Sequence, residues 1–271
     1  ERLMTSVVVG GGPTGVEMSG AIADMRRFVF PKDYPELDFS KMKIYLLEGS
    51  LKTLGPMSEK SHADSMNSLT RLGVIVRTQT HVKSYDGTTV QFGENETLQS
   101  AMVIWAAGIK GNVPGGIDPA LIVRGNRIRV DRNSQVSGLP GIYAIGDIAY
   151  METEAYPHGH PQVASVAIAQ ATNLAHNLIR HQKGLPSREF IYHDKGSMAT
   201  IGRNLAVVDI PKPKLHFRGF FAWLVWMGLH LYLLLGVKNR LTVFFNWMYN
   251  YLTYDQNLRL IFRVFKKQGQ I

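Results

Sequence analysis

The chain has 271 residues, 45% of them hydrophobic, which is enough for one or two domains with buried cores. It contains no cysteine, which excludes disulfide scaffolds, thiolate metal sites and dithiol redox chemistry within it. Residues 211–271 hold nine Lys or Arg and one acidic residue, so +8 of the net charge of +9 belongs to the C-terminal tail.

The first predicted element is a buried strand over residues 6–9, Ser followed by three Val, a composition typical of a parallel sheet. Gly10, Gly12 and Gly15 then fit the G-x-G-x-x-G spacing. The first glycine permits a tight turn, the second lets backbone approach a pyrophosphate, and the third lets the following helix pack on the strand. A helix over 16–25 would point its N-terminal amides at the phosphates. The pattern predicts a dinucleotide site; an ordinary loop is the alternative.

The second predicted strand, residues 43–48, ends on Glu48, the kind of acid that binds ribose hydroxyls in such sites. Its distance from the glycines exceeds the usual spacing of about 20 residues, and a proline-punctuated insert at 28–41 accounts for the excess. A carboxylate here would repel the 2′-phosphate of NADP, so NADH is favoured. A solvated strand-end glutamate is the alternative, and Lys52 leaves NADPH open.

Further elements follow in order. We expect a helix over 58–72, a strand over 73–77, a hairpin over 79–98 and a buried strand over 101–108. A strand at 127–131, a hydrophobic strand in the segment 141–149 that ends on Gly146 and Asp147, and a long alanine-rich helix at 161–182 come next. A hairpin spans 198–210, and PKPK at 211–214 has the composition of a linker.

Three motifs now stand in order: GGGPTGVE, AAG, and GIYAIGD before an alanine-rich helix. Together they resemble the two-dinucleotide flavoprotein oxidoreductases, and most of all the type II NADH dehydrogenases (NADH:quinone oxidoreductases). The resemblance extends to KGSMATIGR at 195–203 and to NWMYNYLTYDQNLRLIF at 246–262, which is its most specific part. Flavoprotein disulfide reductases share the glycine and GD motifs but lack this tail.

The resemblance implies an α/β fold: a Rossmann-like NADH domain at 1–110, part of a Rossmann-like FAD domain at 111–190, and a hairpin with C-terminal membrane-anchoring helices at 191–271. The family's first glycine fingerprint, which holds the FAD pyrophosphate, does not occur in this sequence. The chain also opens almost directly on a strand, without methionine. We therefore expect it to be an N-terminally truncated portion of a longer protein.

The resemblance also implies roles for individual residues toward the cofactors FAD and NADH. Asp147 would bind the ribitol or pyrophosphate side of FAD, with Gly146 giving backbone room and Ala164 near the same cofactor. Ala107 and Gly108 would line the cofactor groove. Glu17 corresponds to a family glutamate near nicotinamide and flavin, although a glutamate in a first helical turn also simply favours the helix dipole.

A quinone site is implied as well. Lys195 corresponds to a family lysine near the flavin and the quinone; a surface lysine before a hairpin is the alternative. In the family, the helix that begins near residue 161 presents two glutamines to the quinone, and here Ser165 and Ala169 occupy those positions. The departure puts the quinone contacts in doubt. The nearby histidines lack metal-ligand spacing, so we expect no metal site.

The tail is aromatic and basic. Residues 217–265 hold 14 of the 27 aromatic residues, and 220–237 is a nearly unbroken apolar run at the lower limit of a membrane span. Amphipathic segments follow, with a basic stripe of Arg259, Arg263 and Lys266. This pattern predicts an anchor that lies on an anionic lipid bilayer surface through residues 217–267. An aromatic core helix or a homodimer contact is the alternative; nucleic acid is disfavoured.

These observations predict FAD-dependent oxidation of NADH with electron transfer to a membrane quinone and without proton pumping. The predicted location is peripheral (monotopic), on the cytoplasmic face of a bacterial inner membrane. The alternatives are another quinone- or ferredoxin-linked flavoprotein reductase, and a catalytically silent membrane-bound redox sensor.

Overall fold

The computed structural model describes residues 2–254. The described residues divide into two compact units, one made of residues 2–107 and 195–254 and the other of residues 108–194. The chain therefore leaves the first unit after Ala107 and returns to it at Lys195. The functional domain boundaries expected from the sequence stay predictions.

A four-stranded parallel sheet lies at the centre of the first unit, in the order β3-β2-β1-β7. Its strands are Thr5–Val9 (β1), Lys43–Leu47 (β2), Val74–Arg77 (β3) and Met102–Trp105 (β7). All five residues of β1 are buried, which confirms the expected buried strand. Val8 packs into the core beneath the helices, whereas Val7 and Val9 pack into the core on the opposite face.

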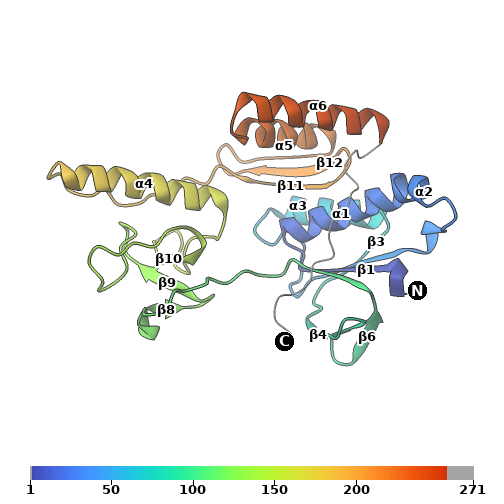
Figure 1. Ribbon diagram of the computed structural model, residues 1–271, viewed down its shortest axis with the longest axis horizontal. Helices are drawn as coiled ribbons and strands as arrows, with labels where there is room; N and C mark the ends of the chain where they lie inside the picture. Colours follow the sequence, from blue (N-terminus) through green and yellow to red (C-terminus); the bar gives the residue numbers. More distant parts are fainter. Residues whose placement is uncertain (1, 255–271) are drawn as a thin grey trace, which may run out of the picture. The chain divides into compact units, whose positions relative to one another are not determined.

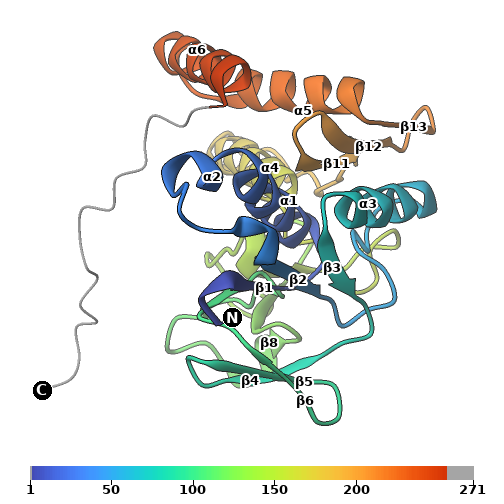
Figure 2. The ribbon, with the colours of Figure 1, turned by 90° about the vertical axis from the view of Figure 1, so that its right-hand side faces the viewer.

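Helices cover one face of this sheet and a small antiparallel sheet covers the other (Figure 2). The helices are α1 (Pro13–Phe28) and α3 (Glu59–Arg71), with the one-turn α2 (Phe30–Asp33) after α1. Ser58 caps α3 by accepting a hydrogen bond from the Ser61 N–H. The antiparallel sheet contains β4 (Val82–Tyr85), β5 (Thr89–Phe92) and β6 (Glu96–Gln99), so the expected hairpin has three strands.

The returning segment adds two further layers above α1 (Figure 1). The first is a meander of β11 (Ser197–Gly202), β12 (Leu205–Ile210) and β13 (Leu215–Arg218). The second holds α5 (Phe220–Leu233) and α6 (Val237–Thr253). Gly20 of α1 lies directly under β11: an added Cβ would be 1.7 Å from the Ile201 carbonyl oxygen, so only glycine allows this packing. PKPK is a turn between β12 and β13 rather than a linker, which corrects the prediction.

A charged cluster joins the meander to α3. The two ring nitrogens of His216 lie 2.8 Å from an Asp209 oxygen and 3.0 Å from an Asp64 oxygen. The Ser58 N–H and hydroxyl donate to Asp209 at 2.7 and 2.9 Å. Burial by itself raises the pKa of the Asp209 carboxyl, but the hydrogen bonds from the serines and the histidine outweigh it and lower that pKa. Asp209 is thereby held ionised at the start of α3.

The second unit is built on a small sheet and one long helix. Its strands are β8 (Ile122–Val123), β9 (Arg127–Val130) and β10 (Ala149–Met151), and its helix is α4 (Ala164–Gln182). The helix begins three residues later than expected. Phe190, after α4, is almost fully buried in the core with the apolar residues of β9 and β10.

Two expected strands differ from the structure. Residues 141–149 are not a continuous strand: Tyr143 forms an isolated bridge with Gln135, a 3-10 turn spans Gly146–Ile148, and β10 starts only at Ala149. Four apolar residues in a row, at 142–145, are a strand signal, but the glycines at both ends, each with positive φ, turn the chain instead. Strand β7 was expected to be buried, yet it is an edge strand of the described sheet and Trp105 is 62% exposed.

The apolar run at 220–237 is divided between α5 and α6, with Gly236 just before α6. Within residues 2–254, no helix combines the length and the apolar character needed to cross a bilayer. The predicted basic stripe of Arg259, Arg263 and Lys266 lies outside the described residues.

Candidate functional site

The glycine turn has the geometry that its spacing predicts. Gly10 follows β1 with φ of +103°, and an added Cβ there would be 2.8 Å from the backbone of Ala106 and Ala107. Gly15 stands in the first turn of α1, where an added Cβ would lie 1.7 Å from the Gly10 carbonyl oxygen. Gly12 is the residue before α1, and a Cβ there would meet no atom within 4 Å. Two glycines are thus required by the protein's own packing, whereas the third leaves open space.

Glu48 lies beside this turn. It follows β2 directly, accepts a hydrogen bond from the Gly11 N–H and accepts another from the Ser50 N–H at 2.6 Å. Burial alone raises the pKa of the Glu48 carboxyl, but these donors, with His81 nearby, outweigh burial and lower it. An ionised carboxylate therefore stands at the carboxyl end of β2, next to the glycine turn, as the sequence predicts.

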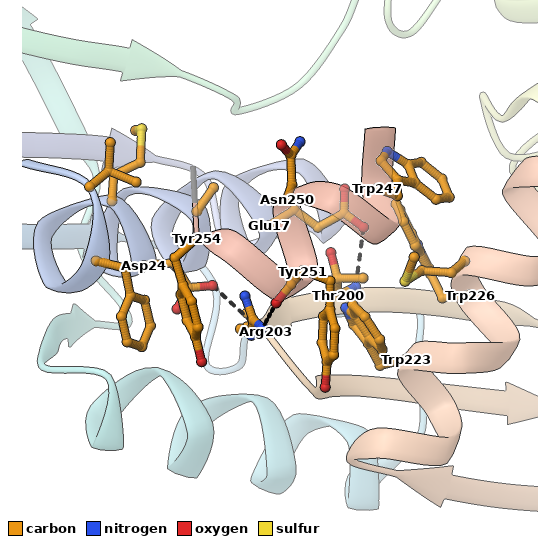
Figure 3. A pocket seen from close by; sticks show the side chains of 16 residues that line it. Glu17, Asp24, Thr200, Arg203, Trp223, Trp226, Trp247, Asn250, Tyr251 and Tyr254 are labelled. Carbon is orange, nitrogen blue, oxygen red and sulfur yellow. Dashed lines mark hydrogen bonds between the residues drawn. The ribbon is translucent and has the colours of Figure 1, made fainter. Parts of the chain in front are cut away.

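Helix α1 carries a second acid, Glu17, one turn beyond the glycines. Its Oε1 accepts a hydrogen bond from the Thr200 N–H of β11 at 3.2 Å (Figure 3). Burial raises the pKa of the Glu17 carboxyl above its usual value, opposed by the Thr200 hydrogen bonds, His230 and Trp226. The carboxylate is thus held partly away from water at the junction of α1, β11 and α5.

A cavity of about 450 Å³ opens beside Glu17, between α1, β11 and the helices α5 and α6. Trp223, Trp226 and Trp247 form its aromatic wall, and Asp24 lies farther along α1 (Figure 3). Sixteen side chains line the cavity: Glu17, Ala21, Asp24, Met25, Phe28, Val29, Thr200, Gly202, Arg203, Trp223, Trp226, Met227, Trp247, Asn250, Tyr251 and Tyr254. A mostly aromatic and apolar chamber with a few acids suits a flat, weakly polar ligand.

Arg203, in the turn after β11, holds the end of α6 over this cavity. Its guanidinium stacks between Tyr251 and Tyr254, at 4.0 and 3.7 Å from the two ring centroids, and donates to the Tyr251 carbonyl. The backbone N–H of Arg203 donates a hydrogen bond to the Asp24 carboxylate at 2.8 Å. These contacts fasten α6 to α1 through the β11–β12 turn.

The sequence did not predict this wall. Three tryptophans were assigned to a membrane-facing segment, whereas all three line the cavity. The spacing of Trp223 and Trp226 by three residues was the available signal, because such residues share a helical face. Lys195 is exposed, two residues before β11 in the same unit, and is not among the described side chains that line the cavity.

The second unit holds the remaining predicted residues. Gly146 has φ of +71° and Asp147 lies in the same 3-10 turn, not at the end of a strand as expected. Two glutamines fix this turn: the Gly146 N–H donates to Gln170 at 2.7 Å, and Gln162 donates to the Asp147 carbonyl at 2.8 Å. Gly108 also belongs to this unit.

Helix α4 begins at Ala164, whose preceding residue provides no side-chain cap. Ser165 in the first turn bonds to the Tyr192 hydroxyl at 2.8 Å. Ala169 packs against the core of this unit. The two positions that were predicted to face the quinone are thus engaged here by a tyrosine and by the core. Among residues 2–254, no three His, Asp or Glu residues are grouped so as to hold a metal ion.

A Glu17→Gln variant is expected to be more stable than the unmodified protein, with a gain that grows as pH rises. The folded-state pKa of this acid is raised above its unfolded-state value, so the fold loses stability as pH rises from the unfolded-state pKa to the folded-state pKa, and the loss is complete above it; glutamine removes this effect. Solvent screens the part-exposed group, so we expect at most about 1 kcal/mol. Denaturant unfolding from pH 5 to pH 8 measures it, with the exposed Glu36→Gln as control. A gain that is constant with pH would contradict the prediction.

Two family models match the chain. The model of pyridine nucleotide-disulphide oxidoreductases matches residues 2–171, and that of the NDH2 C-terminal domain matches residues 194–254. The second match begins one residue before Lys195, where the chain returns to the first unit.

Curated relatives point the same way. The type II NADH:quinone oxidoreductase NdhA of Mycobacterium tuberculosis is 34% identical over 261 residues, which cover 91% of this chain and 54% of the relative. The external NADH-ubiquinone oxidoreductase 2 of Saccharomyces cerevisiae mitochondria is 27% identical over 281 residues, 91% of this chain and 51% of the relative. The chain spans about half the length of the curated relatives it matches.

The fold also matches a solved structure, NDH2 from Plasmodium falciparum in complex with NADH, with a TM-score of 0.80 and 21% identity, over 92% of this chain and 66% of that one. That likeness concerns the fold. Taken with the glycine turn and the two family models, it identifies the chain: it belongs to the pyridine nucleotide-disulphide oxidoreductase family, in the branch of type II NADH dehydrogenases that carries the NDH2 C-terminal domain.

Proposed function

We propose that this chain binds NADH and acts in an FAD-dependent NADH:quinone oxidoreductase that pumps no protons. One observation carries the proposal: a single helix, α1, has the dinucleotide turn at its start and Glu17 beside an aromatic cavity one turn later. The nucleotide site and a chamber suited to a quinone ring are thus adjacent parts of one unit.

In this proposal Gly10, Gly12 and Gly15 receive the pyrophosphate of NADH, and Glu48 accepts hydrogen bonds from the ribose hydroxyls. Ala107, whose backbone lies against the turn at Gly10, would line the same groove, and the part expected of Gly108 stays a prediction. The ionised state of Glu48 suits this role, because a carboxylate accepts from two hydroxyl groups at once.

Residues of the second unit fit part of a flavin site. Glycine at position 146 lets the backbone of the 3-10 turn pass close to α4, since an added Cβ there would be 3.3 Å from the Ala167 side chain. The N-terminus of α4 at Ala164 has no side-chain cap, which leaves backbone amides for an anionic group. Asp147 would accept a hydrogen bond from the ribitol. FAD, when bound, would supply the two-electron chemistry, and these residues would bind and orient it.

The quinone would enter the aromatic cavity, where Glu17 would donate a proton or a hydrogen bond to the ring. Lys195 is not among the residues that line this cavity, and its role near the quinone stays a prediction. The quinone contacts expected of Ser165 and Ala169, which belong to the second unit, stay a prediction. The raised pKa of Glu17 supports its part, because an acid that stays protonated closer to neutral pH is a better donor to a reduced quinone.

We infer further that α5 and α6 rest on a bilayer, from which the quinone reaches the cavity. Most large apolar side chains of the two helices are exposed, an arrangement that marks an interaction surface rather than a core. The protein would be a peripheral membrane protein, placed on the cytoplasmic face of a bacterial inner membrane where NADH is available. The alternative is that the same apolar face of α5 and α6 forms the contact of a homodimer.

The test is a two-stage absorbance experiment on the intact protein purified in detergent. We expect NADH to bleach the flavin absorbance and a water-soluble quinone to restore it. A Trp247→Ala variant should bleach normally but recover more slowly, whereas Tyr85→Ala, an exposed aromatic on β4, should match the unmodified protein. No bleaching would overturn the proposal, and bleaching without recovery would assign the electrons to an acceptor other than quinone.

A further inference from the structure

Two basic residues have their backbones beside Glu48, at the carboxyl ends of neighbouring strands. Lys52 stands in the loop after β2, and this loop is folded around Glu48: the Ser50 N–H bonds to the Glu48 carboxylate, and the Ser50 hydroxyl donates to the Lys52 carbonyl at 2.9 Å. Arg77 is the last residue of β3, opposite Leu47 in the sheet, and its carbonyl accepts from the Glu48 N–H at 2.8 Å.

Each of these cations is bound by a glutamate. The Lys52 ammonium lies 2.5 Å from both carboxylate oxygens of Glu59, the first residue of α3. The Arg77 guanidinium makes two hydrogen bonds, at 2.6 and 2.8 Å, to Glu96, the first residue of β6. It also lies over the Phe92 ring, 5.1 Å from the centroid. Both cations are therefore already paired with a carboxylate of the protein.

The pairing fixes the charge around the predicted ribose position. With Glu48 ionised, three carboxylates and two cations give this set a net charge of −1. A ribose diol is neutral and tolerates that field, whereas a 2′-phosphate carries about two negative charges and is repelled. Without the two glutamates, the same positions would carry a net charge of +1, and two long basic side chains would be free to reach a phosphate.

We propose that Glu59 and Glu96 are specificity-determining residues that exclude a 2′-phosphate by occupying Lys52 and Arg77. This inference rests on the proposed NADH site. NADPH is then excluded by Glu48 together with the two ion pairs, and not by Glu48 alone. The basic residues that could bind a 2′-phosphate are present, but Glu59 and Glu96 already bind their charged groups.

The test measures binding of two redox-inactive probes, ADP-ribose and 2′-phospho-ADP-ribose, to the intact protein by isothermal titration calorimetry. Glu59→Gln and Glu96→Gln should each raise the affinity for the phosphorylated probe about threefold, and the double variant about tenfold. The affinity for ADP-ribose should change by less than about twofold. The gain should shrink as salt is raised, because the freed charges are exposed.

Asp38→Asn is the matched control. It removes one carboxylate of the same unit, 3.4 Å from Lys41, before the amino end of β2, where no ribose is expected. An unchanged affinity of the double variant for the phosphorylated probe, or an equal gain in Asp38→Asn, would overturn the inference while ADP-ribose still binds. Failure of the unmodified protein to bind ADP-ribose would overturn the nucleotide site and this inference with it.

Discussion

A Gly12→Ala variant should fold normally and lose about a hundredfold in affinity for ADP-ribose, close to 3 kcal/mol. Gly12 has φ of −68°, which alanine adopts freely, and a Cβ at this position would meet no protein atom within 4 Å. The open space beside it is where the proposed function places the pyrophosphate, so the new methyl group would occupy the ligand's position. Calorimetric titration measures the affinity, and thermal unfolding measures the fold.

A Gly15→Ala variant distinguishes the two reasons for glycine in this motif, which are room for the ligand and close packing within the protein. Its Cβ would lie 1.7 Å from the Gly10 carbonyl oxygen, so the turn must shift or the protein must unfold even without a ligand. We expect a clear loss of stability in this variant and none in Gly12→Ala. ADP-ribose binding by Gly12→Ala at full affinity would show that no pyrophosphate approaches this turn.

Replacing Phe221, Leu235 and Leu252 together by serine should lower partitioning onto lipid vesicles about a hundredfold. These side chains of the α5–α6 region are 75%, 86% and 71% exposed, so the fold does not depend on burying them. Each apolar side chain inserted at a bilayer surface contributes about 1 kcal/mol under partial burial, and three contributions give roughly two powers of ten. Vesicle sedimentation measures the partitioning.

The matched control replaces three exposed apolar residues of the second unit, Leu178, Leu185 and Ile191, by serine. This control should keep its membrane affinity. Unchanged partitioning in the α5–α6 variant would remove these helices as the membrane surface. Loss of a dimer in detergent, with vesicle binding unaltered, would assign the face to a second copy of the chain.

Much of the architecture could be read from local patterns, because the relevant chemistry lies within a few residues. The valine run of β1, the glycines before α1 and the Ser58 cap of α3 each specify an element through neighbouring residues. The errors occurred where the same local pattern has two outcomes. The apolar run at 142–145 resembles a strand, but within residues 2–254 it pairs with a neighbouring segment only through the bridge at Tyr143.

The sequence also did not predict which strands lie at the edge of the sheet and which lie at its centre. β7 has the composition of a buried strand, yet its place in the sheet order leaves Trp105 exposed. In the same way, an aromatic helix has the same composition whether its tryptophans face lipid or a cavity. Sheet order and helix orientation depend on which surfaces meet, and residue patterns do not encode that directly.

The sequence by itself determined the glycine turn, the acid after β2 and the family, because each depends on residue types at short, fixed spacings. Only the tertiary structure decided that Glu17 meets Thr200 and the tryptophans, that Asp209 holds the start of α3, and that Lys52 and Arg77 are occupied by glutamates. The physical reason is that hydrogen bonds and charge pairs act over a few ångströms of space. Several of these partners stand more than a hundred positions apart in the chain, so only folding brings them within that range.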